Sequence, residues 1–474
     1  MKRIEMCAVL LLAFAVATPV WADGTVEEVS FYSDALGMEK NFQIYLPEGY
    51  ATSGLDYPVV YFVHGMTSNH LGDQNVIDAA EDMISRGLID PFILVKPDAH
   101  CVSLAGAGFD VPIHTSLTNS ELNGDFEDYF VEDLVGWVDA TYRTITDRDH
   151  RFVMGHSQGG YSVMRAALRH PDLFAAVTAH AGALTMEPMA QLGPYMFPAD
   201  YPDGPPYDYR PDAGFISKVL FAYAAAFTPN PANPPWFVDL PFDEFAQPDP
   251  DIWPRFVAHS NTGWAAEFKA SGAELDIYFE VGTQDDMGAD YLAMYFAAAL
   301  DALVLPYTFR WFDGDHHSHV GIRAPNQYTF FMPLNATLEL KPRVLNGKHW
   351  WPLVEATIEL PGDLDVADID TTTLAITQVN GEDLDEPLRA LVASDRSDVN
   401  GNGRDDLTVW FWKPSLLRLL SDLGIADQEP FDVTVEGETN DLLFLAATDE
   451  QRAVHIEAAR AMPLWPMTAM AAVD

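Results

Sequence analysis

The chain has very little cysteine, with only Cys7 and Cys101 in 474 residues. Cys7 falls within an N-terminal stretch that we expect to be removed, so Cys101 remains alone and an internal disulfide is excluded in the mature protein. Stability must then come from the hydrophobic core, which a chain of this length can supply. A lone cysteine is more often a small buried apolar residue than a nucleophile.

Positive charge is also scarce. Lysine and arginine number 26 against 71 aspartate and glutamate residues, which gives a net charge of -45 at pH 7. Nothing in the sequence resembles a basic patch, and this argues against nucleic acid or an anionic membrane surface as a partner. We interpret the acidity as a solubilising surface rather than as a device for binding cations.

Long apolar runs are missing beyond the N-terminus, so no membrane-spanning helix is expected there. The N-terminus itself, MKRIEMCAVLLLAFAVATPVWADG, has a positive start at Lys2 and Arg3, an apolar stretch and a small-residue exit ending at Ala22. This layout predicts a signal peptide over residues 1–22, cleaved after Ala22, and a secreted or periplasmic mature protein.

What the chain does have is a regular alternation of short apolar runs and longer helical patterns from Val29 to about Phe331. Several runs lack the period-two alternation of a half-exposed strand, which favours strands covered on both faces. Residues 23–332 are therefore predicted to form a three-layer α/β domain. We expect strands at 42–46, 59–63, 92–95, 151–154, 175–178, 276–281 and 307–312, and helices at 76–85, 126–141, 160–169 and 290–303.

Two segments depart from this alternation. Residues 184–271 are rich in proline and aromatic side chains, and their length argues for a partly helical insertion rather than a structureless loop. From about Pro333 the chain shows short strand-like runs separated by Gly, Asp and Asn turns, at 353–360, 373–379, 407–412 and 431–435. This pattern predicts a separate all-β, sandwich-like accessory domain over residues 333–453, followed by a tail over 454–474.

The stretch GHSQGG, Gly155 to Gly160, contains the pattern G-x-S-x-G of a nucleophile elbow. Such an elbow needs a strand before the serine, a helix after it and small residues around it, because the serine's backbone is strained. The apolar run before Gly155 and the helical pattern after Gly160 meet these demands. Ser157 is therefore the candidate nucleophile.

An acid and a histidine should follow the serine, each at the carboxyl end of a strand. The expected strand 276–281 leads into a turn that holds Asp285 and Asp286, and the strand 307–312 leads into a segment that holds His316, His317 and His319. The histidine would take the serine proton, and the carboxylate would orient the histidine. The H-x-H spacing also suits zinc, but no other ligand cluster accompanies it.

An acyl-transfer site also needs two backbone N–H donors for the oxyanion. The residue after the nucleophile, Gln158, supplies one of them. The other should come from the loop after an earlier strand, and His64-Gly65-Met66 follows the expected strand 59–63, so we choose Met66.

Taken together, these stretches resemble the esterase D / putative esterase family of α/β-hydrolases, which includes feruloyl and other carbohydrate esterases, S-formylglutathione hydrolase and mycolyltransferases. The resemblance spans Ser33 to about Arg323 apart from the insertion. It is carried by SDALGMEKNFQIYLPEGY, YPVVYFVHG, NGDFEDYFVEDLVGWVDATYRT, GHSQGGYSVMRAALRHPDLFAAVTAHAGAL, VGTQDD and the histidine segment.

The resemblance implies specific roles for the residues at matching positions. It implies Ser157 as nucleophile and points to Asp285 as the acid, with Asp286 as the alternative. The family's histidine is commonly followed by Ser, Thr or Asp and then an aromatic residue, so we choose His317, with His316 as the alternative. The aromatic residue is absent here.

A second motif, Asp398 to Asp406 in the sequence DVNGNGRDD, has oxygen-bearing side chains at loop positions 1, 3, 5 and 9 and a glycine at position 6. It resembles the D-x-[DN]-x-[DN]-G calcium loops, with Asp398, Asn400, Asn402 and Asp406 as ligands. The usual glutamate at position 12 is absent, and the alternative is a plain hairpin turn. We predict structural calcium here and no cofactor for catalysis.

The sequence thus predicts an exported serine esterase that hydrolyses carboxylic esters through an acyl-enzyme, with the aromatic insertion lining or covering the substrate pocket. The substrate would be a small or polymer-linked ester. An acyltransferase using the same triad and a non-catalytic binding protein on a hydrolase scaffold are the alternatives. A peptidase has no support from the resemblance, and export argues against S-formylglutathione hydrolysis.

Overall fold

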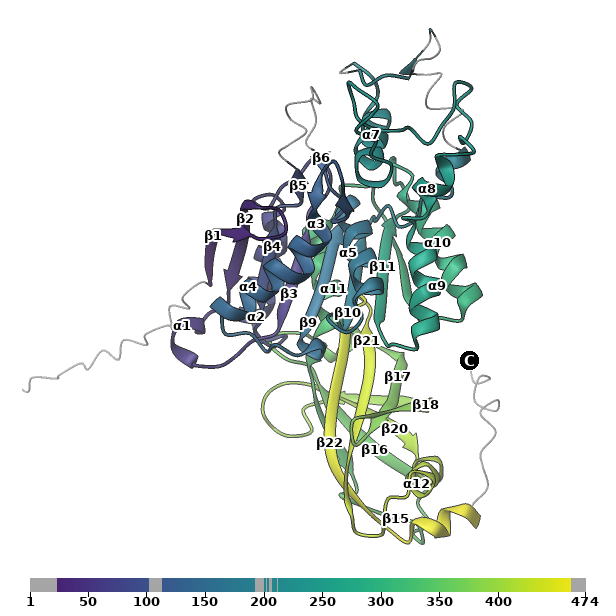
Figure 1. Cartoon of the computed structure of the whole chain (residues 1–474). Coiled ribbons are helices and arrows are strands. Elements are labelled where there is room, and N and C mark those ends of the chain that lie inside the picture. The colour runs from purple at the N-terminus through teal and green to yellow at the C-terminus, as the bar shows by residue number, and fades with distance from the viewer. Residues whose placement is uncertain are drawn as a thin grey trace, which may run out of the picture.

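The computed structural model describes residues 24–101, 113–191, 200–201, 203, 207–210 and 212–461. The predicted signal peptide and most of the predicted tail lie outside these residues. The described chain forms an α/β domain with an insertion at one end and a β-rich domain at the opposite end (Figure 1).

The α/β domain is built on one eight-stranded sheet in the order β1-β2-β4-β3-β9-β10-β11-β12. Within this sheet, the strands β4, β3, β9, β10, β11 and β12 run parallel to one another. At one edge, β1 pairs antiparallel with β2, and β2 pairs antiparallel with β4. Their bounds are β1 Thr25–Ser33, β2 Met38–Leu46, β3 Val59–Val63, β4 Ile93–Pro97, β9 Arg151–His156, β10 Ala176–His180, β11 Asp276–Gly282 and β12 Thr308–Phe312.

The central strands are buried on both faces, as the lack of alternation predicted. Every residue of β3 is buried, with Val59, Tyr61 and Val63 in one apolar cluster and Val60 and Phe62 in another. Helices cover both faces, which makes three layers. One face carries α3 Phe126–Asp128, α4 Val135–Thr141, α5 Gln158–Arg169, α9 Asn261–Ser271 and α10 Ala289–Leu303, and the other carries α2 Gln74–Ser85 and α11 Val320–Phe331.

Two helical regions differ from the sequence prediction. The expected helix 126–141 is interrupted between α3 and α4 by a π-helical stretch at Tyr129–Leu134. The helix α11 was not predicted, and it contains Pro325. Short elements complete the domain: α1 Tyr50–Ser53 and the strand pairs β5 His100–Cys101 with β6 Ile113–His114, and β7 Asn119–Ser120 with β8 Gly124–Asp125.

The insertion is partly helical, as expected. It contains α7 Phe215–Phe227 and α8 Trp253–Val257, which bury an aromatic cluster that includes Tyr223, Phe242 and Phe256. Its last predicted part, α9, instead belongs to the helical layer of the α/β domain, where the amide of Asn261 donates to the carbonyl of Tyr161 in α5 (3.2 Å). The insertion proper therefore ends before α9.

The C-terminal residues form two sheets that bury side chains in one shared core, as a sandwich does. All four strands predicted there are present. One sheet has the order β13-β22-β21-β17-β18 with β15 beside β22, and the other β14-β16-β20-β19. Their bounds are β13 Leu334–Asn335, β14 Thr337–Lys341, β15 Val344–Asn346, β16 Leu353–Glu359, β17 Ile369–Val379, β18 Glu382–Arg389, β19 Val392–Ser397, β20 Asp406–Trp412, β21 Pro430–Thr439 and β22 Phe444–Val454.

The two domains share an apolar interface. The cluster that fills the sandwich continues through Leu334 and Phe331 into the layer of α2 and α11. Polar contacts flank it: the Arg310 guanidinium lies 2.5 Å from a Glu438 carboxylate oxygen, and Arg86 lies 2.6 Å from Asp363. An additional helix, α12 Lys413–Asp422, packs on the sandwich and was not predicted from the strand-like pattern.

Candidate active site

Ser157 occupies a strained turn between β9 and α5. Its φ of 55° and ψ of -119° lie outside the regions that L-residues favour. The turn is possible because its neighbours are glycines: a Cβ on Gly159 would lie 2.0 Å from the carbonyl oxygen of Val63, and one on Gly155 would lie 2.5 Å from the backbone of Gly159. The sequence motif thus has the geometry of a nucleophile elbow.

Ser157, His316 and Asp285 form a continuous hydrogen-bonded chain. The Nε2 atom of His316 lies 2.8 Å from Ser157 Oγ, and its Nδ1 atom lies 2.8 Å from Asp285 Oδ2. These two bonds assign Nδ1–H as donor to the carboxylate and leave Nε2 to accept the serine proton. The side chain of Asp285 is fully buried and that of His316 is 5% exposed, so water competes little for either bond.

The sequence-based choice of His317 as the histidine of the triad was wrong, because His316 is the one that lies between Ser157 and Asp285. His317 is exposed and takes no part in the hydrogen-bonded chain, in which His316 stands instead. The reason lies in a tight turn in which Asp315 Oδ1 accepts the backbone N–H groups of His317 and Ser318 at 3.1 and 2.8 Å. The turn directs His316 inward and its neighbour outward. The alternative acid, Asp286, is also exposed.

The electrostatics of Asp285 suit a carboxylate that stays charged. Burial acts to raise its pKa, but the hydrogen bond from His316 and the backbone N–H groups of Ala289 and Met287 outweigh burial and hold the pKa below its usual range. A charged carboxylate beside Nδ1–H fixes the tautomer of His316 and stabilises its cation.

Two further histidines support this segment, and sequence reasoning missed both. The Nε2–H of His156, inside the GHSQGG motif, donates to the carbonyl of His316 (3.0 Å). His180, at the end of β10, lies 3.2 Å from the carbonyl of Ser318 and 2.8 Å from the buried Glu280 carboxylate. The position of His156 next to the nucleophile was the one available signal.

The predicted oxyanion donors lie beside Ser157. Met66 follows β3 and Gln158 is the first residue of α5, and both line the same pocket as Ser157 and His316. The N–H groups at the start of a helix have no partner within the helix. The N–H of Ser157 itself donates to the carbonyl of His180 (2.9 Å), so it is already engaged.

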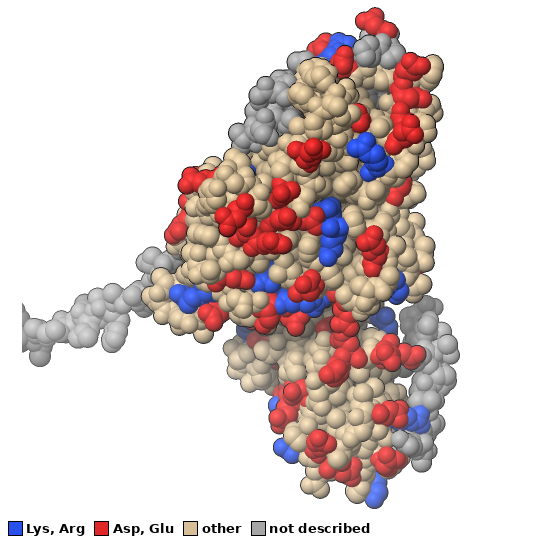
Figure 2. Space-filling view, in the orientation of Figure 1, with Lys and Arg blue, Asp and Glu red and all other residues tan. Residues whose placement is uncertain are grey.

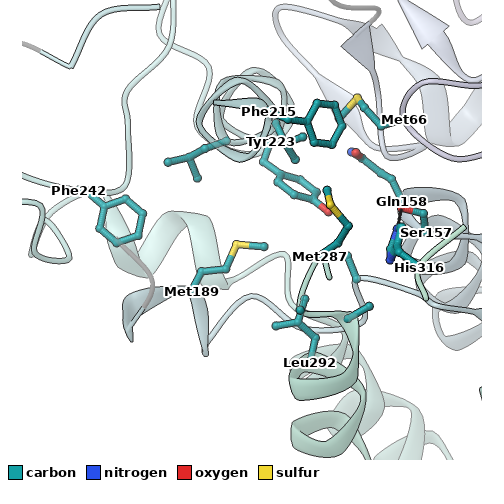
Figure 3. A pocket seen from close by; sticks show the side chains of 15 residues that line it. Met66, Ser157, Gln158, Met189, Phe215, Tyr223, Phe242, Met287, Leu292 and His316 are labelled. Atoms are coloured by element: carbon teal, nitrogen blue, oxygen red, sulfur yellow. Dashed lines mark hydrogen bonds between the residues drawn. The ribbon is translucent and has the colours of Figure 1, made fainter. Parts of the chain in front are cut away.

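The pocket that opens from Ser157 is lined mainly by apolar side chains. Figure 3 shows Ser157 and His316 at one end, with the hydroxyl of Tyr223 directed toward them. The insertion contributes much of the wall through α7 and Phe242, while Met287 and Leu292 come from the loop and helix after β11. The remaining lining residues are Ala183, Met189, Phe215, Val219, Leu220, Gly288 and Ala289.

The other candidate residues lie elsewhere. Cys101 is buried, with its thiol 3.4 Å from the carbonyl of Asn123, as expected for an inert cysteine. His319 contacts the ring of Phe312. Among the described residues, the only group of three His, Cys, Asp or Glu side chains with converging ligand atoms is His64, Asp98 and His100, so the histidine segment forms no zinc-type cluster there.

The predicted calcium loop joins β19 to β20. The carboxylate of Asp398 accepts three backbone N–H groups of the loop at distances between 2.6 and 3.0 Å. The side-chain amides of Asn400 and Asn402 donate to Glu359 of β16 at 2.9 and 2.8 Å. Asp406 accepts from the loop backbone as well (2.8 Å). Glu359 is a residue that sequence reasoning missed, because it comes from another strand.

Comparison with known proteins identifies the family. The model of the family described as "Putative esterase" matches residues 33–329, more than half of the chain. The chain belongs to the putative esterase family. One relative of this chain is Esterase Rv1288 of Mycobacterium tuberculosis, 28% identical over 158 residues, which are 33% of this chain and 32% of the relative.

Another relative is an endo-1,4-beta-xylanase/feruloyl esterase of Xylanibacter ruminicola, 27% identical over 160 residues, covering 32% of this chain and 20% of the relative. This chain thus spans a third or less of the length of these relatives. Among solved structures, a ferulic acid esterase aligns with a TM-score of 0.46 at 18% identity, covering 65% of this chain and 97% of that one. An S-formylglutathione hydrolase from Staphylococcus aureus aligns with a TM-score of 0.44 at 15% identity over 65% of this chain and all of that one.

The surface agrees with the composition. Figure 2 shows acidic side chains spread over both domains on the face in view, and basic side chains scattered among them without forming a continuous patch. Of the helices in the described part of the chain, none combines the length and the apolar character needed to span a membrane.

Proposed function

We propose that this protein is a serine esterase that hydrolyses carboxylic esters through an acyl-enzyme on Ser157, with His316 as general base and acid and Asp285 as its orienting carboxylate. The observation that carries this proposal is the hydrogen-bonded chain from Asp285 through His316 to Ser157, with 2.8 Å at each link. Membership in the putative esterase family supports the same reaction class.

In the proposed mechanism, Ser157 Oγ attacks the ester carbonyl while His316 Nε2 takes its proton. The tetrahedral oxyanion accepts the N–H groups of Met66 and Gln158. The alcohol leaves with the proton from His316. Water then attacks the acyl-enzyme while His316 takes the proton of the water, and His316 finally returns a proton to Ser157 as the acid is released. Asp285 stays ionised throughout and stabilises the imidazolium that forms in each half-reaction.

The apolar pocket supports a substrate with a sizeable apolar part. Its lining from Met66, Met189, Phe215, Phe242 and Leu292 offers contact area but few hydrogen-bond partners. Methionine side chains adapt to ligands of different shape. The insertion therefore serves as a wall over the ester's apolar moiety, and the name of the relative from Xylanibacter ruminicola, a xylanase/feruloyl esterase, is compatible with such an ester class.

The test is a panel of nitrophenyl, feruloyl and acetylated-sugar esters, run on the wild type and on Ser157→Ala. We expect turnover of at least one ester class by the wild type and none above background for the variant. Undiminished turnover by Ser157→Ala would end the proposal. Product analysis with an added alcohol acceptor separates hydrolysis from acyl transfer, and no turnover of any ester would favour a binding protein.

We also propose structural calcium at the loop that contains Asp398, Asn400, Asn402 and Asp406. The donor set fits in kind, because these residues and Glu359 supply the hard oxygens that calcium prefers. The Arg404 guanidinium, 3.4 Å from Glu359, also supplies positive charge there. Calcium should raise the melting temperature of the wild type but not of Asp398→Ala. An equal melting temperature of the wild type with calcium and with a chelator would contradict calcium binding at this loop.

We also propose that the protein is exported through the predicted signal peptide and that it has no nucleic acid or membrane partner. The supports for this proposal are the composition of residues 1–22 and the acidic surface. N-terminal sequencing of the protein after expression in a secreting host should find a start at Asp23 or within a few residues of it. An intact Met1 on the exported protein would contradict the cleavage.

A further inference from the structure

A cluster of three histidines lies behind the oxyanion loop, outside the triad. His64 and His114 are 1% and 0% exposed, and His100 is half-buried. Their rings pack edge to face, with centroids 4.7 Å apart for His64 and His100 and 5.1 Å apart for His64 and His114. Neither the triad nor the pocket uses any of them, so their burial needs an explanation of its own.

The three rings hold three consecutive carbonyls of the oxyanion loop. His114 Nε2 lies 3.0 Å from the carbonyl oxygen of His64, His64 Nδ1 lies 2.8 Å from that of Gly65, and His100 Nε2 lies 3.1 Å from that of Met66. A carbonyl oxygen can only accept, so each of these ring nitrogens must carry the hydrogen. One imidazole N–H is therefore assigned to each carbonyl from residue 64 to residue 66.

The opposite ring nitrogens fix the neutral form. His64 Nε2 accepts the N–H of Ala99 (3.2 Å), and His114 Nδ1 accepts the N–H of Ser116 (3.1 Å). An imidazolium has no lone pair, so protonation of either ring would break one of these bonds. Burial, the largest cause, lowers the pKa of His64 to about 3 and that of His114 well below its usual value, in agreement with this hydrogen-bond pattern.

We infer that His64, His100 and His114 are positioning residues that hold the loop so that the N–H of Met66 faces the reacting carbonyl. A peptide unit is planar, and the Gly65 carbonyl and the Met66 N–H belong to the same unit. Fixing the Gly65 carbonyl therefore fixes the direction of the Met66 N–H, and fixing the Met66 carbonyl holds the next peptide unit in place. An oxyanion donor helps only when it is already in place before the charge develops. The inference rests on the proposed function, because it assigns Met66 to the oxyanion.

A metal site at the same place is less compatible with the contacts. The ligand atoms of His64, Asp98 and His100 lie within 4.8 Å of one another. However, the lone pair of His64 Nε2 already accepts the N–H of Ala99, and the Lys40 ammonium lies 2.8 Å from the Asp98 carboxylate. A cation placed there would face this ammonium at close range.

The first test replaces His100, the least buried of the three. His100→Ala should lower kcat by about 10- to 100-fold with KM nearly unchanged, which is less than the 10²- to 10³-fold typical of deleting a donor outright. The affinity for a boronic acid that mimics the tetrahedral intermediate should fall in proportion to kcat/KM. The matched control is His150→Ala, at a histidine whose side chain is 44% exposed and far from this loop in sequence, and it should change neither quantity.

A second pair of variants separates positioning from general packing and covers the case in which His100→Ala does not fold. His100→Gln places an amide N–H near the position of Nε2 and should retain most of the activity. His100→Asn places its N–H near Nδ1, too far from the Met66 carbonyl, and should be impaired. Equal kcat for the glutamine and asparagine variants would overturn the inference.

The pH profile gives an independent readout. Protonation of the cluster at acid pH should lower kcat in the wild type. The charged and titratable groups that face the cluster, and that affect its protonation, are Asp98, Lys40 and His70. In His100→Gln, the pH at which kcat falls on the acid side of the profile should shift. Stoichiometric zinc on the purified protein, lost together with activity in His100→Gln, would assign the cluster to a metal and overturn the inference. Absence of esterase activity in the wild type would instead refute the proposed function.

Discussion

Replacing His316 by alanine should abolish ester hydrolysis, whereas the same change at the adjacent His317 should leave it nearly intact. His316 contributes both 2.8 Å links of the hydrogen-bonded chain, to Ser157 and to Asp285. His317 is exposed and is held in the turn through its backbone N–H. The two residues are neighbours in sequence, so each variant is a close control for the other.

The expected loss for His316→Ala is about 10⁴- to 10⁶-fold in kcat/KM, equivalent to about 5–8 kcal/mol of transition-state stabilisation. The stability cost is smaller. Two hydrogen bonds are lost, at about 0.5–1.5 kcal/mol each, and Asp285 keeps its bonds to the N–H groups of Met287 and Ala289. A total of about 1–3 kcal/mol leaves a domain of ordinary stability folded.

The assay is hydrolysis of a nitrophenyl ester, with thermal unfolding followed by circular dichroism on the same samples. We expect a folded, inactive His316→Ala and a His317→Ala within about twofold of the wild type, as is usual for a surface substitution. An inactive His317→Ala together with an active His316→Ala would refute the geometric assignment. Full activity in both variants would refute the triad itself.

Three further predictions concern packing, pH and substrate. Gly159→Ala should cost about 3 kcal/mol or more and abolish activity, because its Cβ would lie 2.0 Å from the Val63 carbonyl. The exposed helical Gly136→Ala meets nothing within 4 Å and should gain up to about 1 kcal/mol in denaturant unfolding. Burial lowers the pKa of His64 to about 3, so the unfolded state binds more protons than the native state between pH 6.5 and 3. The stability contribution of this residue is thus present above pH 6.5 and should fall with acidification by up to about 1.4 kcal/mol per pH unit, and a flat unfolding curve across this window would contradict it. In a series of linear acyl esters, kcat/KM should rise about fourfold per added CH₂ until the pocket is filled, and Leu292→Trp should shorten the optimum. A series without any chain-length dependence would show that the acyl chain does not enter this pocket.

Much of the fold was predictable because burial dictates the sequence pattern locally. Strand β3 is apolar at all five positions because both of its faces are covered, and the prediction for it had the same bounds. Ser157 was predictable because the close approach of Gly159 to Val63 requires glycine, and this leaves a readable motif. The helix α11 was missed because Pro325 within a helical pattern normally marks its end.

The choice between His316 and His317 depended on information that spacing does not carry. Two adjacent histidines follow the same strand, and the turn centred on Asp315 decides which of them faces inward. The supporting residues were harder still. His100 and His114 act on the loop after β3 from 34 and 50 residues away in sequence, so only the folded chain brings their N–H groups to its carbonyls.

The most direct measurement of the central claim is mass spectrometry of the protein quenched during turnover of a slowly deacylated ester. We expect a mass increase equal to the acyl group less the hydrogen that it replaces, located on the peptide that contains Ser157, absent from Ser157→Ala and persistent when deacylation is slowed. Turnover without an acylated peptide, or an acyl group on a residue other than Ser157, would contradict the account.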